Sequence, residues 1–444
     1  MKIALSIAGS DSGAGAGIQA DLKTFSALGV YGCTAITAIT AQNTRNVAEI
    51  MEVSPGMIEQ QIKSIMTDIP PDAIKIGMVY NSQTIDVVHR LLKRSRIPVV
   101  LDPIFAAGIG TKLLRDSAYD SFISKLVPMC TLITPNRTEA ERLTGTTIRT
   151  ESDSMEAARR IRKLGAENVI IKGGHFGSAR VTDMLLESKG KVIKIVNPRV
   201  NIDESHGSGC NFSSAVTAYL AKGAVLHDAC KMANEYVHIA IKNAVRVGSG
   251  LPVTNPLSAI YRDASRYRTI TELQQVVEEV SKLVDFYKLI PETQTNFAYA
   301  LPDAVETSEV AGVRGRIARI GNLAKPVSYV EFGASLHVAS AIIAYMKFSP
   351  LFRAGINIRL NERLLKVCRL LFSVSRYDRR REPGGVKKKE GSSVSWGIQQ
   401  ALLRNPKADV IYHLGDVGKE PMIIIFGRNP GDIAAKIKAI LKHY

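Results

Sequence analysis

The chain has 444 residues, of which 45% are hydrophobic and 22% are charged, a composition that excludes a disordered chain and a fibrous one. At about 150 residues per domain, this length predicts two or three domains. No uninterrupted apolar stretch approaches the roughly 18 to 20 residues of a membrane helix, and the apolar start of the chain soon meets glycines and Asp11. We therefore expect a cytoplasmic protein that has no signal peptide and no membrane partner.

The formal net charge of +17 is unevenly distributed along the chain. Residues 1–250 contain 29 Lys and Arg against 23 Asp and Glu, whereas residues 251–444 contain 29 against 18. Such a positive field favours acidic ligands, namely phosphates, pyrophosphate or nucleic acid. The five cysteines are odd in number, widely spaced and never arranged as CxxC, which argues against a disulfide framework or a structural zinc site.

Residues 1–250 alternate short apolar runs, which predict strands, with amphipathic stretches, which predict helices. The predicted strands are Ile3–Ala8, Thr34–Thr40, Ala73–Ile76, Val99–Leu101, Leu132–Thr134 and Asn168–Ile171. The predicted helices include Gly17–Leu28, Met57–Met66, Ser154–Leu164 and Phe212–Lys222. This alternation predicts an α/β fold with a mostly parallel sheet that is covered by helices on both faces.

The pattern changes after a segment rich in helix breakers at residues 250–256. A clean amphipathic helix is predicted over residues 269–286. Further predicted elements are the strands Arg314–Ile320, Val327–Phe332 and Met422–Phe426 and the helices His337–Met346 and Pro430–Lys442. We therefore expect a domain over residues 1–255, a linker over 256–268, and a second, smaller α/β domain over 269–444.

A glycine-rich turn, GSDSGAGAG at residues 9–17, follows the first predicted strand and opens the first predicted helix. The backbone N–H groups of such a turn can hold a polar or anionic group. The glycine spacing is not the GxGxxG of a dinucleotide fold, and the chain contains no GxxxxGK[ST] phosphate-binding loop. The alternative is a tight turn without a ligand, although so many glycines are costly unless another group must approach the backbone.

A second motif, HGSGC at residues 206–210, precedes a helix predicted from Asn211. Glycines before a helix start leave several N–H groups free beside the positive end of the helix dipole. A phosphoryl group in transfer needs such an anion hole. Cys210 would lie in the first turn, where we expect a lowered thiol pKa; the alternative is a buried cysteine that follows a glycine turn.

Seven motifs in residues 1–250 resemble, in order and spacing, the hydroxymethylpyrimidine/phosphomethylpyrimidine kinases of thiamine biosynthesis, members of the ribokinase-like superfamily. They are GSDSGAGAGIQADLK at 9–23, AITAQNT at 38–44, KIGM at 75–78, LDP at 101–103, TPN at 134–136 with Glu139, KGGH at 172–175, and HGSGC at 206–210. Two mild departures occur, because Ala14 stands where the family usually has glycine and Ser208 where it usually has threonine.

The resemblance implies roles for individual residues. It places Gly9, Ala16, Asp21, Gln42 and Met78 in the substrate pocket, with the Gln42 amide reading the aminopyrimidine edge as donor and acceptor. It gives Asp102 and Glu139 as Mg²⁺ ligands, direct or through water, and Asn136 and Lys172 as contacts to the nucleotide phosphates. Gly207, Ser208 and Gly209 would form the anion hole, and Cys210 would deprotonate or orient the substrate hydroxyl. Singly, Asp102, Glu139 and Lys172 could equally be strand-end or surface residues.

The C-terminal part carries many isolated basic residues at the ends of predicted elements, and no helix-turn-helix or aromatic platform, which argues against nucleic acid as a partner. Residues 377–391 form a polar tract in which we expect Lys387–Lys389 to be solvated. Motifs over residues 270–444 resemble the archaeal-type thiamine-phosphate synthase domain. They include VRGRI at 313–317, VEFGASLHVA at 330–339, NIR at 357–359, DRR at 378–380 and GDVGKEP at 415–421. This domain type also occurs behind DNA-binding modules, where it senses ligands.

The resemblance implies that the C-terminal part joins the pyrimidine diphosphate to hydroxyethylthiazole phosphate and releases pyrophosphate. That reaction needs a cationic site for phosphates, for which arginine forks are suited. We expect Arg316 and His337 to be catalytic and Arg359 and Lys419 to bind phosphate, with Asp416 and Glu420 as possible Mg²⁺ ligands. His337 could instead be a satisfied cap or core histidine.

Together, the two resemblances predict a bifunctional transferase. Its partners would be hydroxymethylpyrimidine and its phosphates, ATP as phosphoryl donor, Mg²⁺ and thiazole phosphate, and the chain would form a homodimer or higher homo-oligomer. The main alternative is the same kinase with a C-terminal domain that only senses ligands. A remoter one is a kinase for pyridoxal-type substrates, because related enzymes share the fold.

Overall fold

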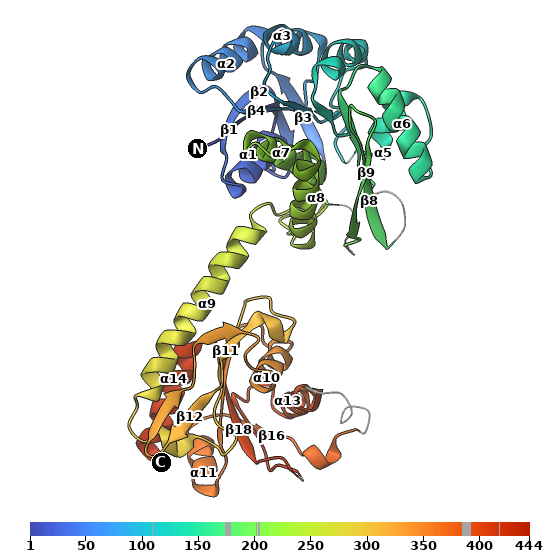
Figure 1. The fold of residues 1–444 in the computed structure, drawn as a ribbon. Helices are drawn as coiled ribbons and strands as arrows, with labels where there is room; N and C mark the ends of the chain where they lie inside the picture. Colours follow the sequence, from blue (N-terminus) through green and yellow to red (C-terminus); the bar gives the residue numbers. More distant parts are fainter. Residues whose placement is uncertain (109, 174–178, 201, 203–204, 384–391, 417) are drawn as a thin grey trace. The chain divides into compact units, whose positions relative to one another are not determined.

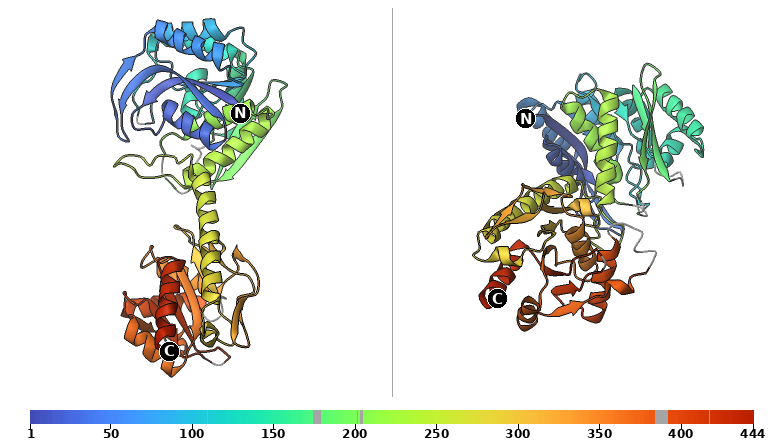
Figure 2. Two further views of the ribbon diagram at one scale, coloured as in Figure 1. Left: turned by 90° about the vertical axis from the view of Figure 1, so that its left-hand side faces the viewer. Right: turned by 60° about the horizontal axis from the view of Figure 1, so that its bottom comes forward.

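The chain folds into two compact units, Met1–Ile260 and Tyr261–Tyr444 (Figures 1 and 2). The computed structural model describes residues 1–444 except 109, 174–178, 201, 203–204, 384–391 and 417, so the expectations for Gly174, His175 and Lys387–Lys389 lie outside the described residues. Helix α9, Ser258–Ser281, starts just before the division between the units. The segment that we expected to be a linker is therefore helical from Ser258 onwards.

The first unit is built on a nine-stranded sheet with the strand order β3-β2-β1-β4-β5-β6-β7-β8-β9. Neighbours from β2 to β7 pair in parallel, and β3, β8 and β9 add antiparallel edges. The strands are β1 Ile3–Asp11, β2 Tyr31–Gln42, β3 Val47–Glu52, β4 Ala73–Ile76, β5 Val99–Leu101, β6 Leu132–Ile133, β7 Asn168–Ile171, β8 Arg180–Leu186 and β9 Val192–Pro198. The expected mostly parallel sheet is confirmed.

Helices cover both faces of this sheet, because successive side chains of a strand point to opposite sides. Ile74 and Ile76 pack in the core shared with α2 Pro55–Asp68, α3 Ser82–Leu92, α5 Arg137–Thr144 and α6 Glu151–Lys163. Ala73 belongs to the opposite face, which is covered by α1 Gly17–Ala27, α7 Ser208–Ala221 and α8 Leu226–Lys242. Lys75 alternates with Ile74 and Ile76, so it points to this second face.

The second unit contains a seven-stranded sheet with the order β14-β11-β10-β15-β18-β17-β16 and a two-stranded sheet of β12 and β13. Its strands are β10 Phe297–Ala300, β11 Val310–Val313, β12 Ile317–Ile320, β13 Leu323–Pro326, β14 Val330–Phe332, β15 Ala354–Arg359, β16 Val374–Arg376, β17 Val410–His413 and β18 Met422–Gly427. Only the β16–β17 pair is parallel among the described pairs. Helices and strands are mixed throughout, as expected for a second α/β domain.

Two cores sandwich the larger sheet of the second unit. Helices α9, α11 Glu362–Leu371 and α14 Pro430–His443 cover one face, and α10 His337–Met346 and α13 Ser392–Arg404 cover the other. Along β17, Val410 and Tyr412 belong to the first core and Ile411 to the second. His413 therefore points to the face that α10 and α13 cover.

Two strand predictions in the second unit were wrong in extent. The predicted strand Arg314–Ile320 begins only at Ile317, because Gly315 and Arg316 both have left-handed backbone angles, with φ of 72° and 73°, which a strand cannot contain. The predicted strand Val327–Phe332 is likewise replaced by β13, which ends at Pro326, and β14, which begins at Val330.

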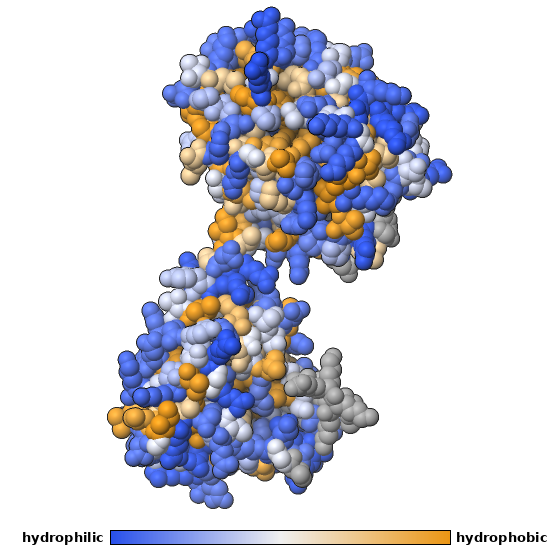
Figure 3. Space-filling model, viewed as in Figure 1, coloured by the Kyte–Doolittle hydropathy of each residue, from blue (hydrophilic) through white to orange (hydrophobic). Residues whose placement is uncertain are grey.

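On the face shown in Figure 3, hydrophilic side chains predominate on both units and hydrophobic side chains gather in smaller areas. All five cysteines are buried and unpaired. Among the described residues, no helix combines the length and apolar character needed to cross a membrane.

Candidate active site

A cavity of about 950 Å³ lies in the first unit. Its walls come from segments at the carboxyl ends of the parallel strands β1, β2, β4, β5 and β7, together with the start of α7. Ligands of open α/β sheets bind at this edge, because helix starts and loops converge there. The cavity is lined by most of the residues that the sequence singled out: Gly9, Ala16, Gln42, Met78, Asp102, Asn136, Glu139, Lys172, Gly207, Ser208, Gly209 and Cys210.

The glycine-rich turn is organised by the carboxylate of Asp11. Asp11 Oδ1 accepts a hydrogen bond from the Gly13 N–H at 2.8 Å, and Oδ2 accepts from the N–H groups of Gly15 at 3.0 Å and Ala16 at 2.8 Å. Ala14 has a left-handed φ of 57°, a conformation that costs an alanine roughly 1 to 2 kcal/mol. This geometry explains why glycine is the usual residue at that position of the resembling family.

His206 joins this turn to Gln42. Its Nε2 lies 3.3 Å from Asp11 Oδ2 and 3.2 Å from the side-chain nitrogen of Gln42. The ring also packs against Gly15, where an added Cβ would stand 2.3 Å from His206 Cδ2. The Gln42 amide at the end of β2 is therefore held by the residue that precedes the HGSGC glycines.

The start of α7 forms an uncapped anion site. The helix begins at Ser208, after Gly207 with φ of 89°, and no side chain caps it. A Cβ on Gly207 would stand 1.9 Å from the Gly15 carbonyl oxygen, and one on Gly209 would stand 3.3 Å from Lys172 Nζ. Gly207 must be glycine because its neighbour there is backbone, whereas a side chain at Gly209 would only crowd the end of Lys172. The first-turn N–H groups thus lie beside the glycine-rich turn and a lysine ammonium.

Cys210 lies in the first turn of α7, as expected, but its thiol pKa differs from our expectation. Burial raises the pKa of the Cys210 thiol to about 11, although Lys75 acts in the opposite direction. The expected lowering was wrong because the thiol is 8% exposed and because Asp102 and Asp21 also disfavour a thiolate. The free enzyme therefore holds Cys210 as a neutral thiol at neutral pH.

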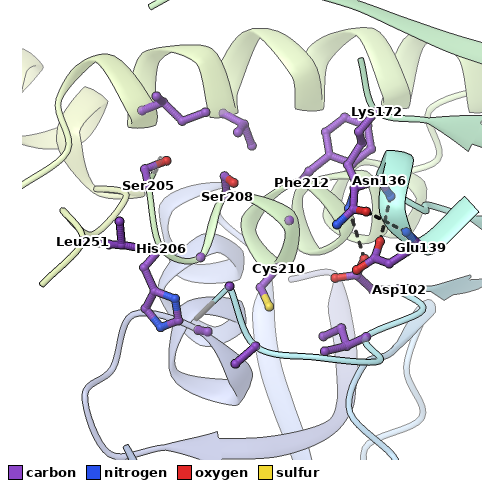
Figure 4. Close-up of a pocket in the computed structure, with 18 of the residues that line it drawn as sticks. Asp102, Asn136, Glu139, Lys172, Ser205, His206, Ser208, Cys210, Phe212 and Leu251 are labelled. Carbon is purple, nitrogen blue, oxygen red and sulfur yellow. Dashed lines mark hydrogen bonds and ion pairs between the residues drawn. The ribbon is translucent and has the colours of Figure 1, made fainter. Parts of the chain in front are cut away.

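Asp102, Glu139 and Lys172 form a charged group on the other side of Cys210 from His206 (Figure 4). Lys172 Nζ lies 3.3 Å from Asp102 Oδ1. Burial would raise the pKa of Asp102, but Lys172 and Lys75 hold it below its usual range. Burial raises the pKa of Glu139 to about 7, which Lys172 opposes and the charge of Asp102 reinforces.

Glu139 and Asn136 are fixed by the start of α5. The Asn136 side chain accepts from the Glu139 N–H at 2.9 Å, and Glu139 Oε2 accepts from the Asn136 N–H at 2.7 Å, which together make a capping box. The sequence TPN followed by Glu139 contains this cap. Glu139 and Asp102 both line the cavity, and the charge of Asp102 acts on Glu139.

The structure changes the place that we expected for Asp21. Asp21 does not line the cavity and has no solvent-exposed side-chain surface. It accepts hydrogen bonds from Lys75 Nζ, from Ser6 Oγ and from Ser214 Oγ at 2.7 Å. Asp21 thus lies below the lining and holds Lys75, which does line the cavity.

Three residues of this site were not selected from the sequence: Lys75, Asp11 and His206. A lysine inside the buried strand AIKI at 73–76 was the available signal, because a charge is rarely buried without a partner. Burial would lower the pKa of Lys75, but Asp21, Cys210 and Asp102 raise it above its ordinary value, so the lysine stays charged. His206 and Asp11 were inside quoted motifs, but only the fold brings them together.

In the second unit, the charges of Arg316 and Lys419 both act on His337. Burial lowers the pKa of His337 to about 4, with further lowering by Arg379, Arg316 and Lys419. His337 is the first residue of α10, and its Nε2 is buried without a hydrogen-bond partner among the described residues. Arg316 is exposed and donates a hydrogen bond to the Thr293 carbonyl. The alternative of a satisfied histidine therefore does not hold for Nε2.

The charge of Arg359 acts on the carboxylate of Glu420. Burial would raise the pKa of Glu420, but hydrogen bonds from the N–H groups of Glu292 and Thr293 lower it, with Arg359 acting in the same direction. Lys419 is exposed in a turn that Asp416 closes. No group of three or more His, Cys, Asp or Glu that could hold a metal ion occurs within the described ranges of the chain.

The family model for phosphomethylpyrimidine kinase matches residues 11–255, which is more than half of the chain. The chain belongs to this family. A second model, for the thiamine-phosphate synthase ThiN, matches residues 272–439. The bifunctional thiamine biosynthesis protein ThiDN of Methanocaldococcus jannaschii is 31% identical over 445 residues, which cover 100% of this chain and 99% of that protein. This phosphomethylpyrimidine kinase is thus fused to a thiamine-phosphate synthase domain, as the sequence motifs predict.

Relatives and solved structures also match the kinase part alone. The hydroxymethylpyrimidine/phosphomethylpyrimidine kinase of Bacillus subtilis is 43% identical over 254 residues, or 57% of this chain and 93% of that protein. The crystal structure of an ADP complex of Bacillus subtilis pyridoxal kinase has 36% sequence identity and a TM-score of 0.55, and covers 59% of this chain and 99% of that chain. The first unit therefore shares its fold with a kinase whose structure was solved with ADP.

Proposed function

We propose that residues 1–255 transfer the γ-phosphoryl group of ATP to the hydroxyl of hydroxymethylpyrimidine, and then a second one to the resulting monophosphate. The observation that carries this proposal is the arrangement of one cavity. The uncapped start of α7, which carries Cys210, and Lys172 meet at one place, and Gln42 lines the same cavity. Phosphoryl transfer needs positioning and a cationic cradle for the group in transfer, and this cavity supplies both.

In this proposal the pyrimidine lies against Gln42, Met78 and Gly9. The Gln42 amide pairs with the ring nitrogen and amino group, and Met78, which is 6% exposed, packs on the ring. A Cβ on Gly9 would stand 2.7 Å from the Met78 sulfur, so glycine leaves room for that side chain. The substrate hydroxyl then points to Cys210 and the N–H groups of α7.

Asn136 and Lys172 would hold the nucleotide phosphates, and Asp102 with Glu139 fits Mg²⁺ as a pair of hard oxygen donors. The position of Asp102 and Glu139 at one place in the cavity supports this assignment, because the charge of Asp102 raises the pKa of Glu139 and a divalent cation would offset that repulsion. Bound Mg²⁺ would neutralise the charge on the transferred phosphate. The chain itself orients the hydroxyl through Cys210 and holds the phosphate on the α7 N–H groups.

Cys210 can act as a base only as a thiolate, and the charge of Lys75 favours that form. The Lys75 ammonium is charged, is held by Asp21, and lowers the cost of a thiolate on Cys210. The thiol first loses its proton to solvent, and the thiolate then takes the substrate hydroxyl proton as the hydroxyl oxygen bonds to the γ-phosphorus and the bond from that phosphorus to ADP breaks. Cys210 is thereby returned to the neutral thiol. Asp21 serves this step through Lys75 rather than through contact with substrate.

We further propose that residues 269–444 join the pyrimidine diphosphate to thiazole phosphate and release pyrophosphate, with 256–268 as the connection between the two domains. The match of residues 272–439 to thiamine-phosphate synthase supports the reaction. Arg316 and His337 would be catalytic, and Lys419 would bind phosphate, because the charges of Arg316 and Lys419 both act on His337. Arg359, whose charge acts on Glu420, would bind a further phosphate.

One experiment distinguishes a hydroxymethylpyrimidine kinase from the alternative, a kinase for pyridoxal-type substrates. ADP formation is measured with hydroxymethylpyrimidine, with its monophosphate and with pyridoxal at equal concentrations. We expect turnover of both pyrimidines, with kcat/KM for pyridoxal lower than for hydroxymethylpyrimidine. The opposite order would contradict the assignment of Gln42 to an aminopyrimidine edge.

A second experiment tests the synthase alone. The full-length C210A variant, supplied with pyrimidine diphosphate and thiazole phosphate but no ATP, should form thiamine phosphate. A variant that binds thiamine phosphate but forms none would instead support the ligand-sensing alternative for the second domain.

A further inference from the structure

Arg379 is a buried cation that has no partner among the residues that the structure describes. Its residue is 8% exposed, and its guanidinium makes no hydrogen bond or ion pair with any described part of the chain. Its neighbour Arg380 is exposed and pairs with Asp378 at 3.2 Å. A buried arginine normally has a carboxylate or phosphate partner, because an unpaired buried charge is costly.

His413 presents an unmet donor at the same place. It is 1% exposed, and its Nδ1 accepts a hydrogen bond from the Gly415 N–H at 3.1 Å. The ring proton must then be on Nε2, which is buried and has no partner among the described residues. The Nε2–H of His413 is therefore a buried donor without an acceptor among the described residues.

The unmet groups form one cluster on the face of the large sheet that α10 and α13 cover. The Tyr377 ring lies 5.2 Å from the His413 ring, and its hydroxyl is also buried without a partner. Arg379 and His337 both lower the pKa of His413, and Arg379 also lowers the pKa of His337. Tyr377 and Arg379 are neighbours in sequence, whereas His337 begins α10 and His413 ends β17, so only the fold joins them.

The charge of the cluster is positive. Arg379, Arg316 and Lys419 act on His337 from around it, while the carboxylate of Glu382 acts on Tyr377 and has one buried oxygen without a partner. Burial keeps both histidines neutral at neutral pH, so they act as N–H donors rather than as cations. Several donors and an unpaired guanidinium in a buried site match a multiply charged oxyanion.

We infer that Arg379 and His413, with His337, form a binding site for a diphosphate group. The inference rests on the proposed synthase function, in which such a group enters on one substrate and leaves as pyrophosphate. The Arg379 guanidinium would bind two oxygens of the group side by side, and the Nε2–H of His413 would donate to a third. Arg316 and Lys419, both exposed, would stand at its solvent side.

The test uses the full chain and inorganic pyrophosphate as the probe, in calorimetric titrations with the kinase site saturated by a non-hydrolysable ATP analogue. The variant R379Q should weaken pyrophosphate binding about 10- to 100-fold, the loss of one charge-assisted contact. R379K should recover part of that loss, and R380Q, the matched control, should change binding less than twofold. The circular dichroism of each variant reports whether it is folded.

H413N supplies a second measurement. Asparagine can keep an acceptor for the Gly415 N–H but removes the Nε2 donor, so pyrophosphate binding should weaken at least fivefold. Equal effects of R379Q and R380Q, or no pyrophosphate binding in the unaltered chain, would overturn the inference. Pyrophosphate binding that depends on Arg379 in a chain without synthase activity would keep this site and overturn the proposed function. Normal synthase activity in R379Q and H413N would overturn this diphosphate site and keep the proposed synthase function.

Discussion

Lys75 and Asp21 form an ion pair in which neither side chain has solvent-exposed surface. Lys75 projects from β4 toward α1, which carries Asp21, and the electrostatic influence of Lys75 reaches Cys210 and Asp102. The pair therefore connects the interior of the first unit to the cavity. It places a fixed positive charge where the proposed reaction needs one.

Breaking this pair should destabilise the first unit. K75M leaves the Asp21 carboxylate buried and unpaired, which should cost about 3 to 5 kcal/mol. K2M, the matched control, removes an exposed pair with Asp72 and should cost at most about 1 kcal/mol. Urea unfolding followed by circular dichroism measures both, and the fluorescence of Trp396, the one tryptophan of the sequence, reports the second unit separately. Equal losses for K75M and K2M would show that Lys75 does not hold a buried charge.

Q42L should weaken binding of the pyrimidine and leave ATP binding unchanged. A buried polar ligand that loses a hydrogen-bond partner costs about 1 to 3 kcal/mol, so KM for hydroxymethylpyrimidine should rise about 5- to 150-fold. Q83L, at an exposed glutamine of α3, serves as control. An unchanged pyrimidine KM would remove Gln42 from the substrate site.

The pH dependence of the kinase should follow Cys210. The thiol pKa is raised to about 11 by burial, so the thiol is protonated across pH 7 to 9 and the basic form becomes more abundant as pH rises. If Cys210 is the base, kcat/KM should increase roughly tenfold per pH unit in this range. C210A should lower kcat by about 10² to 10⁴ and abolish the slope. A flat profile, or a C210A variant with most of its turnover, would assign the reaction to the α7 N–H groups and leave Cys210 as packing.

Glu139 should make the Mg²⁺ requirement depend on pH. Burial raises its pKa to about 7, so the carboxylate becomes protonated as pH falls through 7. The Mg²⁺ ion then loses one of its oxygen ligands. The Mg²⁺ concentration for half-maximal kinase rate should therefore rise between pH 8 and pH 6. E139Q, which can keep the α5 cap through its amide oxygen, should need more Mg²⁺ at pH 8 and show little further change at pH 6. An E139Q variant with the pH response of the unaltered chain would contradict this role.

The left-handed backbone of Arg316 should lower the stability of the second unit, while its guanidinium should serve synthase activity. Its left-handed φ of 73° costs a non-glycine residue roughly 1 to 2 kcal/mol, a cost that R316G removes together with the guanidinium. R316G should therefore unfold at equal or higher urea concentration by Trp396 fluorescence, yet lose synthase activity while kinase activity is kept. Retained synthase activity would make the strained arginine a feature of the turn alone.

The parallel strands of residues 1–250 could be predicted because they are buried apolar runs, and the site residues because they sit in contiguous motifs. The edge strands β3, β8 and β9 were not predicted, and β3 and β9 are largely exposed, so they lack a continuous apolar run. The contact between His206 and Gln42, 164 positions apart, follows from strand order, which periodicity does not encode. The pKa of Cys210 was predicted in the wrong direction, since helix position is local but burial and the charges of Asp21 and Asp102 are not. Arg379 and His413 were missed because each unmet donor is visible only when its neighbours are placed.

The most direct test of the whole account is a time course with the purified full-length chain, hydroxymethylpyrimidine, thiazole phosphate, ATP and Mg²⁺. The account predicts that the pyrimidine monophosphate forms first and the diphosphate next. Thiamine phosphate and pyrophosphate should follow in equal amounts, and omission of ATP should abolish every product. Accumulation of the diphosphate without any thiamine phosphate would contradict the synthase assignment, and ADP formation that does not depend on the pyrimidine would contradict the kinase assignment.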